Sequence, residues 1–181
     1  RMGISEADTN YDIPFDVEDE QIKFTVVRGT QRISAMLDSG GQMTVIDKQL
    51  TERLGLPLSA DSIWFNETRC PLALLDTLRL GAAVFVNIPC VVLPLGEAGV
   101  TDCSLILGND VLQLFPEIEL DYGVRELRLK SHTTPLPDAP RNLMLHKIPY
   151  ILVKLNGIPA TMVWDTGASK SSVEPGFHEA H

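Results

Sequence analysis

The sequence MLDSGG at residues 36–41 carries a β-run directly into an acidic tight turn, and the fold prediction starts from it. The β-formers IKFTVV at 22–27 and ISAML at 33–37 flank the turn-forming RGTQ at 28–31. Two β-runs separated by a short glycine-containing segment are typical of a hairpin. The pattern therefore predicts a β-hairpin that ends at Asp38.

The same arrangement occurs a second time, towards the end of the printed sequence. The runs ILVKL at 151–155 and IPATMVW at 158–164 flank Asn156-Gly157 and lead into Asp165-Thr166-Gly167. Asn-Gly favours a two-residue hairpin turn, because both residues tolerate positive φ. Aligning Asp38 with Asp165 keeps the apolar faces in register; the matched pairs are Phe24 with Ile151, Val26 with Val153, and Met36 with Val163. Such repetition indicates repeated structure.

Between the two copies, short apolar segments predominate. Asp47 is placed to cap a helix over 48–54 that Gly55 ends, and this is the one clear helix that the sequence predicts. SLILG at 104–108 predicts a buried strand, and residues 117–129 alternate as a hairpin around Gly123. Many short strands with turn signals are typical of an all-β barrel or sandwich.

Four segments follow from these patterns. We expect an acidic, irregular extension over 1–21, one complete β-lobe over 22–130, a linker over 131–147, and the start of a second, similar lobe over 148–181. The linker prediction rests on Pro135, Pro137 and Pro140, which stiffen a chain and interrupt packed elements. The second copy has no counterpart to the helix or the SLILG strand, so we expect that lobe to be incomplete.

Paired Asp-Ser/Thr-Gly triplets suit one kind of chemistry. Two carboxyl groups held close together share one proton, because their charges repel, and the pair can both accept a proton from water and donate one to a substrate. Asp38 and Asp165 are the candidate catalytic pair. The glycines Gly40 and Gly167 allow close approach of the backbone. The hydroxyls of Ser39 and Thr166 are suited to bracing one loop against the other.

These motifs resemble the active-site loops of the retropepsin-like aspartic proteases. MLDSGG at 36–41 and VWDTGAS at 163–169 match those loops, and ILGNDVL at 106–112 matches the family's segment of two apolar residues followed by glycine. The resemblance covers about 22–130 and restarts near Ile148. It implies a small closed β-barrel lobe, an active site where two lobes meet, no cofactor or metal, and a polypeptide substrate bound as an extended strand.

The same resemblance locates a flap, a hairpin that covers the cleft, between residues 59 and 75. Trp64 and Phe65 are the candidate cleft or flap residues, and Asn66-Glu67 is the candidate tip. This region contains no glycine, and Gly41 stands where the family more often has alanine. The tandem arrangement is similar to that of bacterial extracytoplasmic members, which implies a periplasmic or secreted location.

Bulk composition excludes several other classes. The 181 residues carry a formal net charge of -9 and no basic run, which argues against nucleic acid as a partner. No segment approaches the length of a membrane span. Cys70, Cys90 and Cys103 match no zinc pattern, and either one disulfide with one free thiol or three reduced thiols fits them.

Several alternatives remain open from the sequence. The two carboxylates are expected either from Asp38 and Asp165 of one chain or from Asp38 of two chains in a homodimer. A catalytically weak peptide-binding or assembly module is the rival to an endopeptidase, motivated by the glycine-free flap and the short second copy. A third arrangement places residues 1–21 in the cleft as an inhibitory segment.

Overall fold

The computed structural model describes residues 1–5, 9–65, 67–135 and 142–180. Asn66 of the expected flap tip, Pro137 and Pro140 of the expected linker, and His181 lie outside the described residues. No helix in the described part of the chain is long and apolar enough to cross a membrane.

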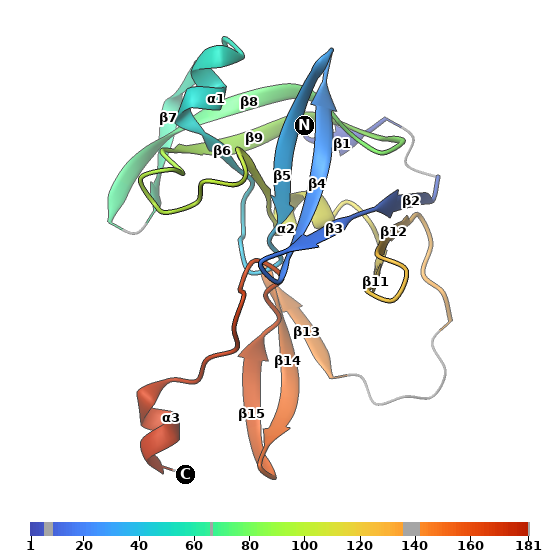
Figure 1. The fold of residues 1–181 in the computed structure, drawn as a ribbon, viewed down its shortest axis with the longest axis vertical. Helices are drawn as coiled ribbons and strands as arrows, with labels where there is room; N and C mark the ends of the chain where they lie inside the picture. Colours follow the sequence, from blue (N-terminus) through green and yellow to red (C-terminus); the bar gives the residue numbers. More distant parts are fainter. Residues whose placement is uncertain (6–8, 66, 136–141, 181) are drawn as a thin grey trace.

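Strands dominate the fold, as predicted (Figure 1). The strands up to residue 107 are β1 Gly3–Ile4, β2 Tyr11–Pro14, β3 Asp16–Glu18, β4 Gln21–Arg28, β5 Gln31–Leu37, β6 Val45–Asp47, β7 Leu58–Phe65, β8 Thr68–Leu80, β9 Ala83–Leu93 and β10 Leu105–Leu107. The later strands are β11 Glu117–Asp121, β12 Glu126–Lys130, β13 Leu143–His146, β14 Ile148–Leu155 and β15 Ile158–Val163. The helices are α1 Lys48–Arg53, α2 Asn109–Leu112 and α3 Pro175–Ala180.

The main sheet forms a ring. Its hydrogen-bonded neighbours run β9–β6–β10–β5–β4–β8, and β8 pairs again with β9. The ring is not a regular barrel, because β4 meets β8 through only Val26↔Leu80 and Val27↔Arg79, while β8 and β9 are much longer than their neighbours. The expected all-β lobe is therefore present, and its closure is less regular than the expected closed barrel.

The predicted first hairpin is present, and a third strand, β10, pairs with its second strand. β4 pairs with β5 in antiparallel register, and β10 runs parallel to β5 with Leu107 opposite Leu37. The backbone N–H of Asp38 donates to the Leu107 carbonyl at 2.9 Å. The predicted strand at 104–108 thus lies directly beside the end of the hairpin and fixes where the acidic loop leaves the sheet.

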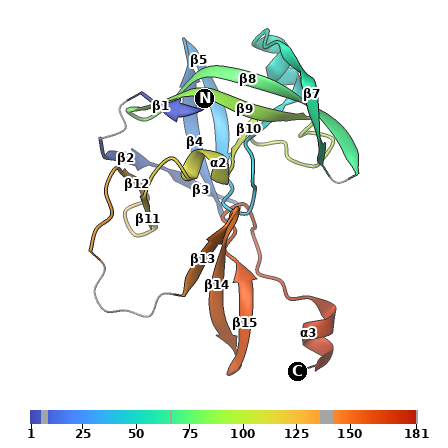
Figure 2. The same cartoon turned by 180° about the vertical axis from the view of Figure 1, so that it is seen from behind.

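The N-terminal segment differs from the prediction. Residues 1–21 were expected to be irregular, but the described part contributes β1, β2 and β3. β2 pairs with β12, and Tyr11, Ile13 and Phe15 are buried in the main core (Figure 2). The alternation of buried and exposed residues in β2 explains this packing, because one face of a strand meets the core. Residues 11–15 therefore lie in the core and not in a cleft, whereas Glu20, at the other end of this segment, lines a cavity next to Asp165.

The helices are short, and α2 and α3 are present in addition to the one helix that the sequence clearly predicted. α1 is capped as predicted, since the Asp47 carboxylate accepts from the N–H groups of Gln49 and Leu50. α2 is the helical turn after Gly108. α3 was not predicted; Pro175 occupies its first position, where a proline costs no hydrogen bond.

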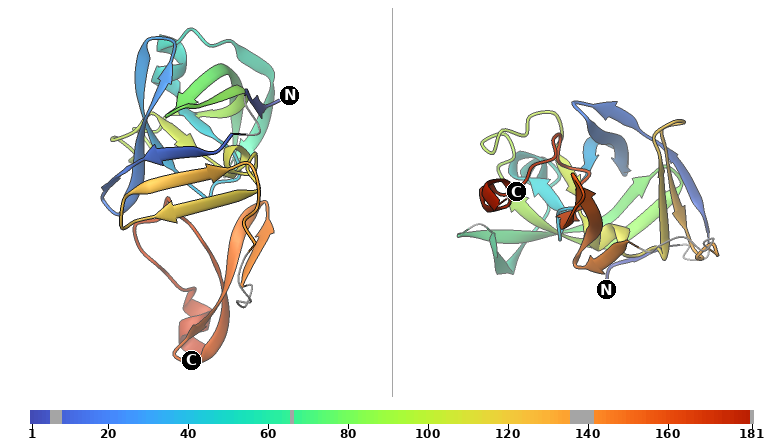
Figure 3. Two further views of the ribbon diagram at one scale, coloured as in Figure 1. Left: turned by 90° about the vertical axis from the view of Figure 1, so that its right-hand side faces the viewer. Right: turned by 90° about the horizontal axis from the view of Figure 1, so that it is seen from below.

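The C-terminal part is a separate three-stranded sheet that extends from the main lobe (Figure 3). β14 and β15 form the predicted second hairpin, and its turn residues Asn156 and Gly157 have φ of 50° and 87°. The expected linker contains strand β13, which pairs with β14. The prolines in 131–147 led to the prediction of a linker throughout, and the strand near the end of this range was missed.

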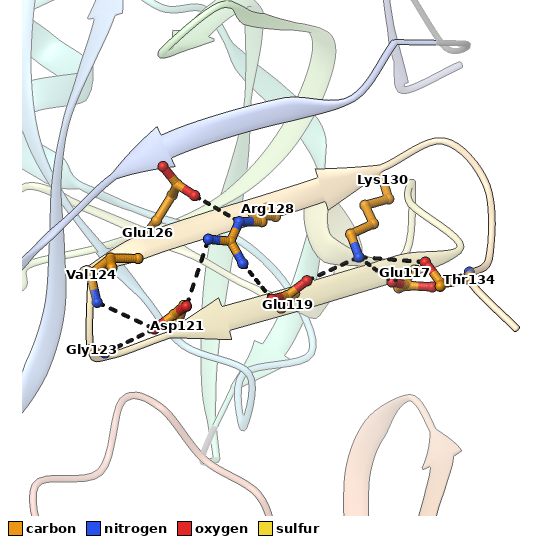
Figure 4. A network of polar contacts seen from close by, with 9 residues as sticks. All are labelled: Glu117, Glu119, Asp121, Gly123, Val124, Glu126, Arg128, Lys130 and Thr134. Carbon is orange, nitrogen blue, oxygen red and sulfur yellow. Dashed lines mark hydrogen bonds and ion pairs between the residues drawn. The ribbon is translucent and has the colours of Figure 1, made fainter. Parts of the chain in front are cut away.

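An ion-pair network fastens the start of the connection to the lobe (Figure 4). Lys130 pairs with Glu117 at 2.6 Å and with Glu119 at 2.9 Å, and Arg128 contacts Glu119. Glu117 also accepts from the N–H and hydroxyl of Thr134. The lysine is the first cause that lowers the pKa of Glu117 to about 2. The chain therefore leaves β12 in a defined direction.

The three cysteines are free and buried. Of the two possibilities that the sequence allowed, three reduced thiols is the one present. Burial raises the pKa of Cys103, and the thiols pack as small apolar side chains.

Gly108 is a packing glycine beside the backbone that follows the acidic loop. A Cβ there would lie 2.5 Å from the Met43 carbonyl carbon and 2.9 Å from the Thr44 nitrogen, both in backbone that cannot rotate away. We predict that Gly108→Ala lowers the free energy of unfolding by about 1–3 kcal/mol, measured by urea denaturation. Gly96→Ala is the control, because no heavy atom lies within 4 Å of its Cβ position; equal effects in both variants would contradict the packing argument.

Candidate active site

The two acidic triplets meet at the junction between the main lobe and the C-terminal sheet (Figure 1). The Ser39 N–H donates to Thr166 Oγ1 at 3.0 Å, and the Thr166 N–H donates to Ser39 Oγ at 3.0 Å. Each hydroxyl then donates onward, Ser39 to the Trp164 carbonyl at 2.7 Å and Thr166 to the Leu37 carbonyl at 2.9 Å. Four hydrogen bonds thus join loops that are far apart in the sequence.

Both hydroxyls are buried within this junction. A buried donor or acceptor that loses its hydrogen-bond partner destabilises the protein, so the arrangement holds only when both loops are in place. The two triplets are also related in kind, since each serine or threonine occupies the same position after its aspartate. The sequence predicted bracing hydroxyls, and the structure brings Ser39 and Thr166 together in this way.

The same junction brings the carboxyl groups of Asp38 and Asp165 against each other's loops. The Gly41 N–H donates to Asp38 Oδ1 at 2.8 Å, and the Gly167 N–H donates to Asp165 Oδ1 at 2.8 Å. A Cβ on Gly40 would lie 2.5 Å from Asp165 Cγ, and one on Gly167 would lie 2.8 Å from Asp38 Cγ. Both glycines are therefore required for the close approach, because any side chain would overlap the opposite carboxyl group.

Burial is the first cause that raises the pKa of Asp38 to about 6, from an ordinary value of 3.8. The negative charge of Asp165 is the second cause, and a hydrogen bond between the two side chains adds to it. The N–H groups of Gly41 and Gly40 oppose the rise by stabilising the carboxylate. Asp38 is partly buried whereas Asp165 is exposed, so the pair is unsymmetrical in its contact with water.

A second layer of polar contacts lies under the Asp38 loop. Asp110 accepts from the Thr44 N–H at 3.1 Å and from its hydroxyl at 2.8 Å, and Thr44 Oγ1 accepts from the Gly108 N–H. Burial raises the pKa of Asp110. Sequence reasoning missed this role; the adjacency of Asp110 to the apolar-apolar-glycine strand was the one available signal.

Side-chain amides also connect the two parts of the chain. Asn109 and Gln113 both donate to the carbonyl of Lys147, which lies between β13 and β14 and has a φ of 64°. Gln21 donates to the carbonyl of Gly167 at 2.8 Å. None of these contacts was predicted, and no local pattern identifies them, because each partner lies tens of residues away.

Two cavities adjoin the junction. One of about 730 Å³ lies between β15, Asp165 and the segment up to α3. The other, of about 210 Å³, is mostly apolar and is lined from the main lobe and from β13. Trp164 lines both. The larger cavity lies directly beside Asp165.

The structure places Trp64 and Phe65 elsewhere. They lie at the end of β7, in the hairpin with β8, where Trp64 is 75% exposed and Phe65 40% exposed. Neither lines the two cavities next to the acidic loops. The expected hairpin exists, and Glu67 takes a φ of 66° in place of a glycine. Within the described residues, no group of three or more His, Cys, Asp or Glu side chains could hold a metal ion.

Comparison with known proteins supports the expected retropepsin-like fold through one family model and one solved structure. Residues 22–111 match the family model described as "Aspartyl protease". The chain resembles the crystal structure of a retropepsin-like aspartic protease from Rickettsia conorii, with 20% identity and a TM-score of 0.51, over 71% of this chain and 93% of that one. It also resembles the retroviral protease-like domain of Ddi1 from Leishmania major, with 16% identity and a TM-score of 0.46, over 65% and 95% of the two chains. No curated protein sequence matches the chain.

Thr166→Val tests the reciprocal hydrogen bonds. Valine keeps the shape of threonine but leaves the Ser39 N–H and the Leu37 carbonyl without their partner. We predict a loss of about 1–3 kcal/mol in the free energy of unfolding, measured by urea denaturation. Thr161→Val, on the exposed face of β15, is the control and should change stability little; a Thr166 variant as stable as this control would refute the bracing role.

The raised pKa of Asp38 also predicts that the stability of the protein depends on pH. Its pKa is higher in the folded protein than its ordinary value, so between pH 3.8 and about 6 the folded state binds more protons than the unfolded state. The free energy of unfolding therefore falls as pH rises through this window. We expect Asp38→Asn to remove that fall, as measured by denaturation at a series of pH values; an unchanged slope would show that another group titrates there.

Proposed function

This chain belongs to the retropepsin-like aspartyl protease family, and on that premise we propose that it is an aspartic endopeptidase in which Asp38 and Asp165 activate water. The observation that carries the proposal is the close approach of the two carboxyl groups through glycines that permit no side chain. The raised pKa of Asp38, to about 6, supports a pair that retains one proton in mildly acidic solution.

The proposed reaction uses both states of the pair. The ionised carboxylate takes a proton from a water molecule held between Asp38 and Asp165, and the protonated carboxyl donates to the peptide carbonyl oxygen as the water adds. The resulting tetrahedral intermediate collapses when the carboxyl group that took the water's proton gives it to the amide nitrogen, the other carboxylate takes back a proton from a hydroxyl of the intermediate, and the carbon–nitrogen bond breaks, which restores the singly protonated pair. The two groups titrate as a unit, so activity belongs to the pair and not to one residue.

We propose that the larger cavity beside Asp165 receives part of the polypeptide substrate. It is lined by the edge of β15 and by Trp164, which offers apolar surface, and an extended peptide binds naturally along a strand edge. We also propose that residues 22–130, together with β2 and β3, act as one lobe and that 148–181 supply the second half-site. Pairing within one chain is supported by the Ser39–Thr166 hydrogen bonds.

A peptide-binding module without efficient turnover is the second candidate. It is favoured by the position of Trp64, which lies in the β7–β8 hairpin away from both cavities. An enzyme of the proposed kind needs that hairpin over the acids to exclude water. The two candidates differ in one result: the binding module retains peptide without cutting it.

We predict that Asp38→Asn and Asp165→Asn each lower kcat for cleavage of an unfolded protein by about 10²–10⁴-fold or more, because the amide can neither accept nor share the proton. Cleavage by the unmodified protein should decline as pH rises through about 6, where Asp38 ionises.

Cleavage of an unfolded protein such as casein is followed by mass spectrometry, with and without a statine-type peptide inhibitor whose hydroxyl group mimics the tetrahedral intermediate. Asp61→Asn, in exposed β7, is the matched control and should leave kcat unchanged. Persistent cleavage in both active-site variants, or binding without any cleavage by the unmodified protein, would overturn the proposed reaction.

A further inference from the structure

One further hydrogen bond crosses the junction, in addition to the reciprocal bonds between Ser39 and Thr166, and it comes from β4. Gln21, the half-buried first residue of β4, donates from Nε2 to the carbonyl oxygen of Gly167 at 2.8 Å. Gly167 follows Asp165 and Thr166 in the second triplet. The side chain therefore reaches from the main lobe to the backbone that carries the second carboxyl group.

The orientation of this amide is set by a buried cation. Lys23 is only 5% exposed, and its Nζ lies 3.0 Å from Gln21 Oε1 and 2.5 Å from Asp102 Oδ2. An ammonium has donors and no acceptor, so only the amide oxygen of Gln21 can face it. The amide nitrogen must then point the other way, towards Gly167.

Lys23 in turn has reason to stay in place. Burying an ammonium is costly unless it is paired, and Asp102 supplies the opposite charge. Lys23 is the first cause that lowers the pKa of Asp102, so the carboxylate stays ionised to well below neutral pH. The ion pair thus holds the glutamine amide in a single orientation.

Gly167 needs such a restraint. Its own N–H donates to Asp165 Oδ1, and a Cβ at this position would collide with Asp38, so the residue must be glycine. Glycine has the greatest backbone freedom of any residue. Fixing the carbonyl of Gly167 limits rotation about its backbone and keeps its N–H directed at the carboxylate.

The contact is also one-sided. When Asp38 is aligned with Asp165, Gln21 falls on Ile148, which has no hydrogen-bond donor in its side chain. The first acidic loop instead has the Leu107 carbonyl and the Asn109 N–H as backbone partners, through Asp38 and Gly41. The second loop depends on a side chain for the restraint that β10 and α2 give the first.

We propose that Gln21, oriented by the Lys23–Asp102 ion pair, is a positioning residue that holds the Gly167 backbone and so aims the Asp165 carboxylate at Asp38. The inference rests on the proposed function for its effect on catalysis. Its effect on the loop itself is measurable without any activity.

The experiment compares Gln21→Met with Gln31→Met in the full chain. Methionine has nearly the length and shape of glutamine but no amide donor, and Gln31 is exposed at the far end of the same hairpin. We expect hydrogen exchange of the Gly167 amide to quicken by about fivefold to tenfold in Gln21→Met, the factor that corresponds to one lost hydrogen bond. Gln31→Met should leave that exchange unchanged.

Activity supplies the second measurement. A misaimed carboxylate slows the chemical step more than it weakens binding, so kcat should fall by about tenfold or more with a smaller change in KM. The upper limb of the pH–rate profile should also move to lower pH, because a more distant Asp165 charge raises the pKa of Asp38 less. A purely structural role for Gln21 would leave this limb in place.

Gln21→Glu is the second variant. It retains an oxygen for Lys23 and lacks the N–H for Gly167, so we expect the same faster exchange as in Gln21→Met. Unchanged exchange in both variants, or an unchanged pH limb and kcat in an active protein, would overturn the positioning role. Absence of cleavage by the unmodified protein would instead overturn the proposed function, while the exchange comparison would still decide whether Gln21 holds the loop.

Discussion

The candidate site depends on four hydrogen bonds between two loops that begin more than a hundred residues apart. Ser39 and Thr166 each accept from the backbone of the other loop and donate to a carbonyl beyond it. Three of these hydrogen bonds are buried and the one to the Trp164 carbonyl is partly buried, so each loop needs the other to satisfy its polar atoms. This mutual requirement places the two carboxyl groups together and makes the junction a single structural unit.

The rest of the main lobe supports one side of that junction. β10 runs parallel to β5 beneath the Asp38 loop, and Gly108 permits the backbone of residues 43 and 44 to pass at van der Waals distance. Thr44 and Asp110 satisfy the polar groups exposed by this crossing. The side of the junction that bears Asp165 has no comparable strand among the described residues, and side-chain amides from the main lobe contact it instead.

Burial and neighbouring positive charge shift the pKa values of carboxyl groups in opposite directions at the two ends of the lobe. At the junction, burial raises the pKa of Asp38 and Asp110, which makes these carboxyl groups weaker acids than usual. On β11 and β12, lysine lowers the pKa of Glu117 and holds it ionised in a half-buried network. The first effect suits proton transfer, and the second fixes the direction of the connecting chain without affecting the acids.

The elements that could be predicted from the amino-acid sequence are those whose signals are local. The two hairpins, the Asp47-capped helix and the strand before Gly108 follow from apolar alternation, turn residues and capping, which act within about ten residues. The repetition of Asp-Ser/Thr-Gly also predicted that Asp38 and Asp165 form a pair and that the hydroxyls of Ser39 and Thr166 brace the two loops. The burial of Tyr11, Ile13 and Phe15 was missed because the acidic residues around them obscured a short alternating strand.

The contacts between distant segments could not be predicted, because they depend on how the whole chain packs. Gln21, Asn109 and Gln113 are ordinary polar residues in the sequence, and each acquires a role because the fold brings a backbone carbonyl to its side chain. The placement of Trp64 away from the cavities was likewise set by the course of β7 and β8. Local patterns encode which residues form a strand or a turn, whereas the position of one loop against another depends on packing of the whole chain.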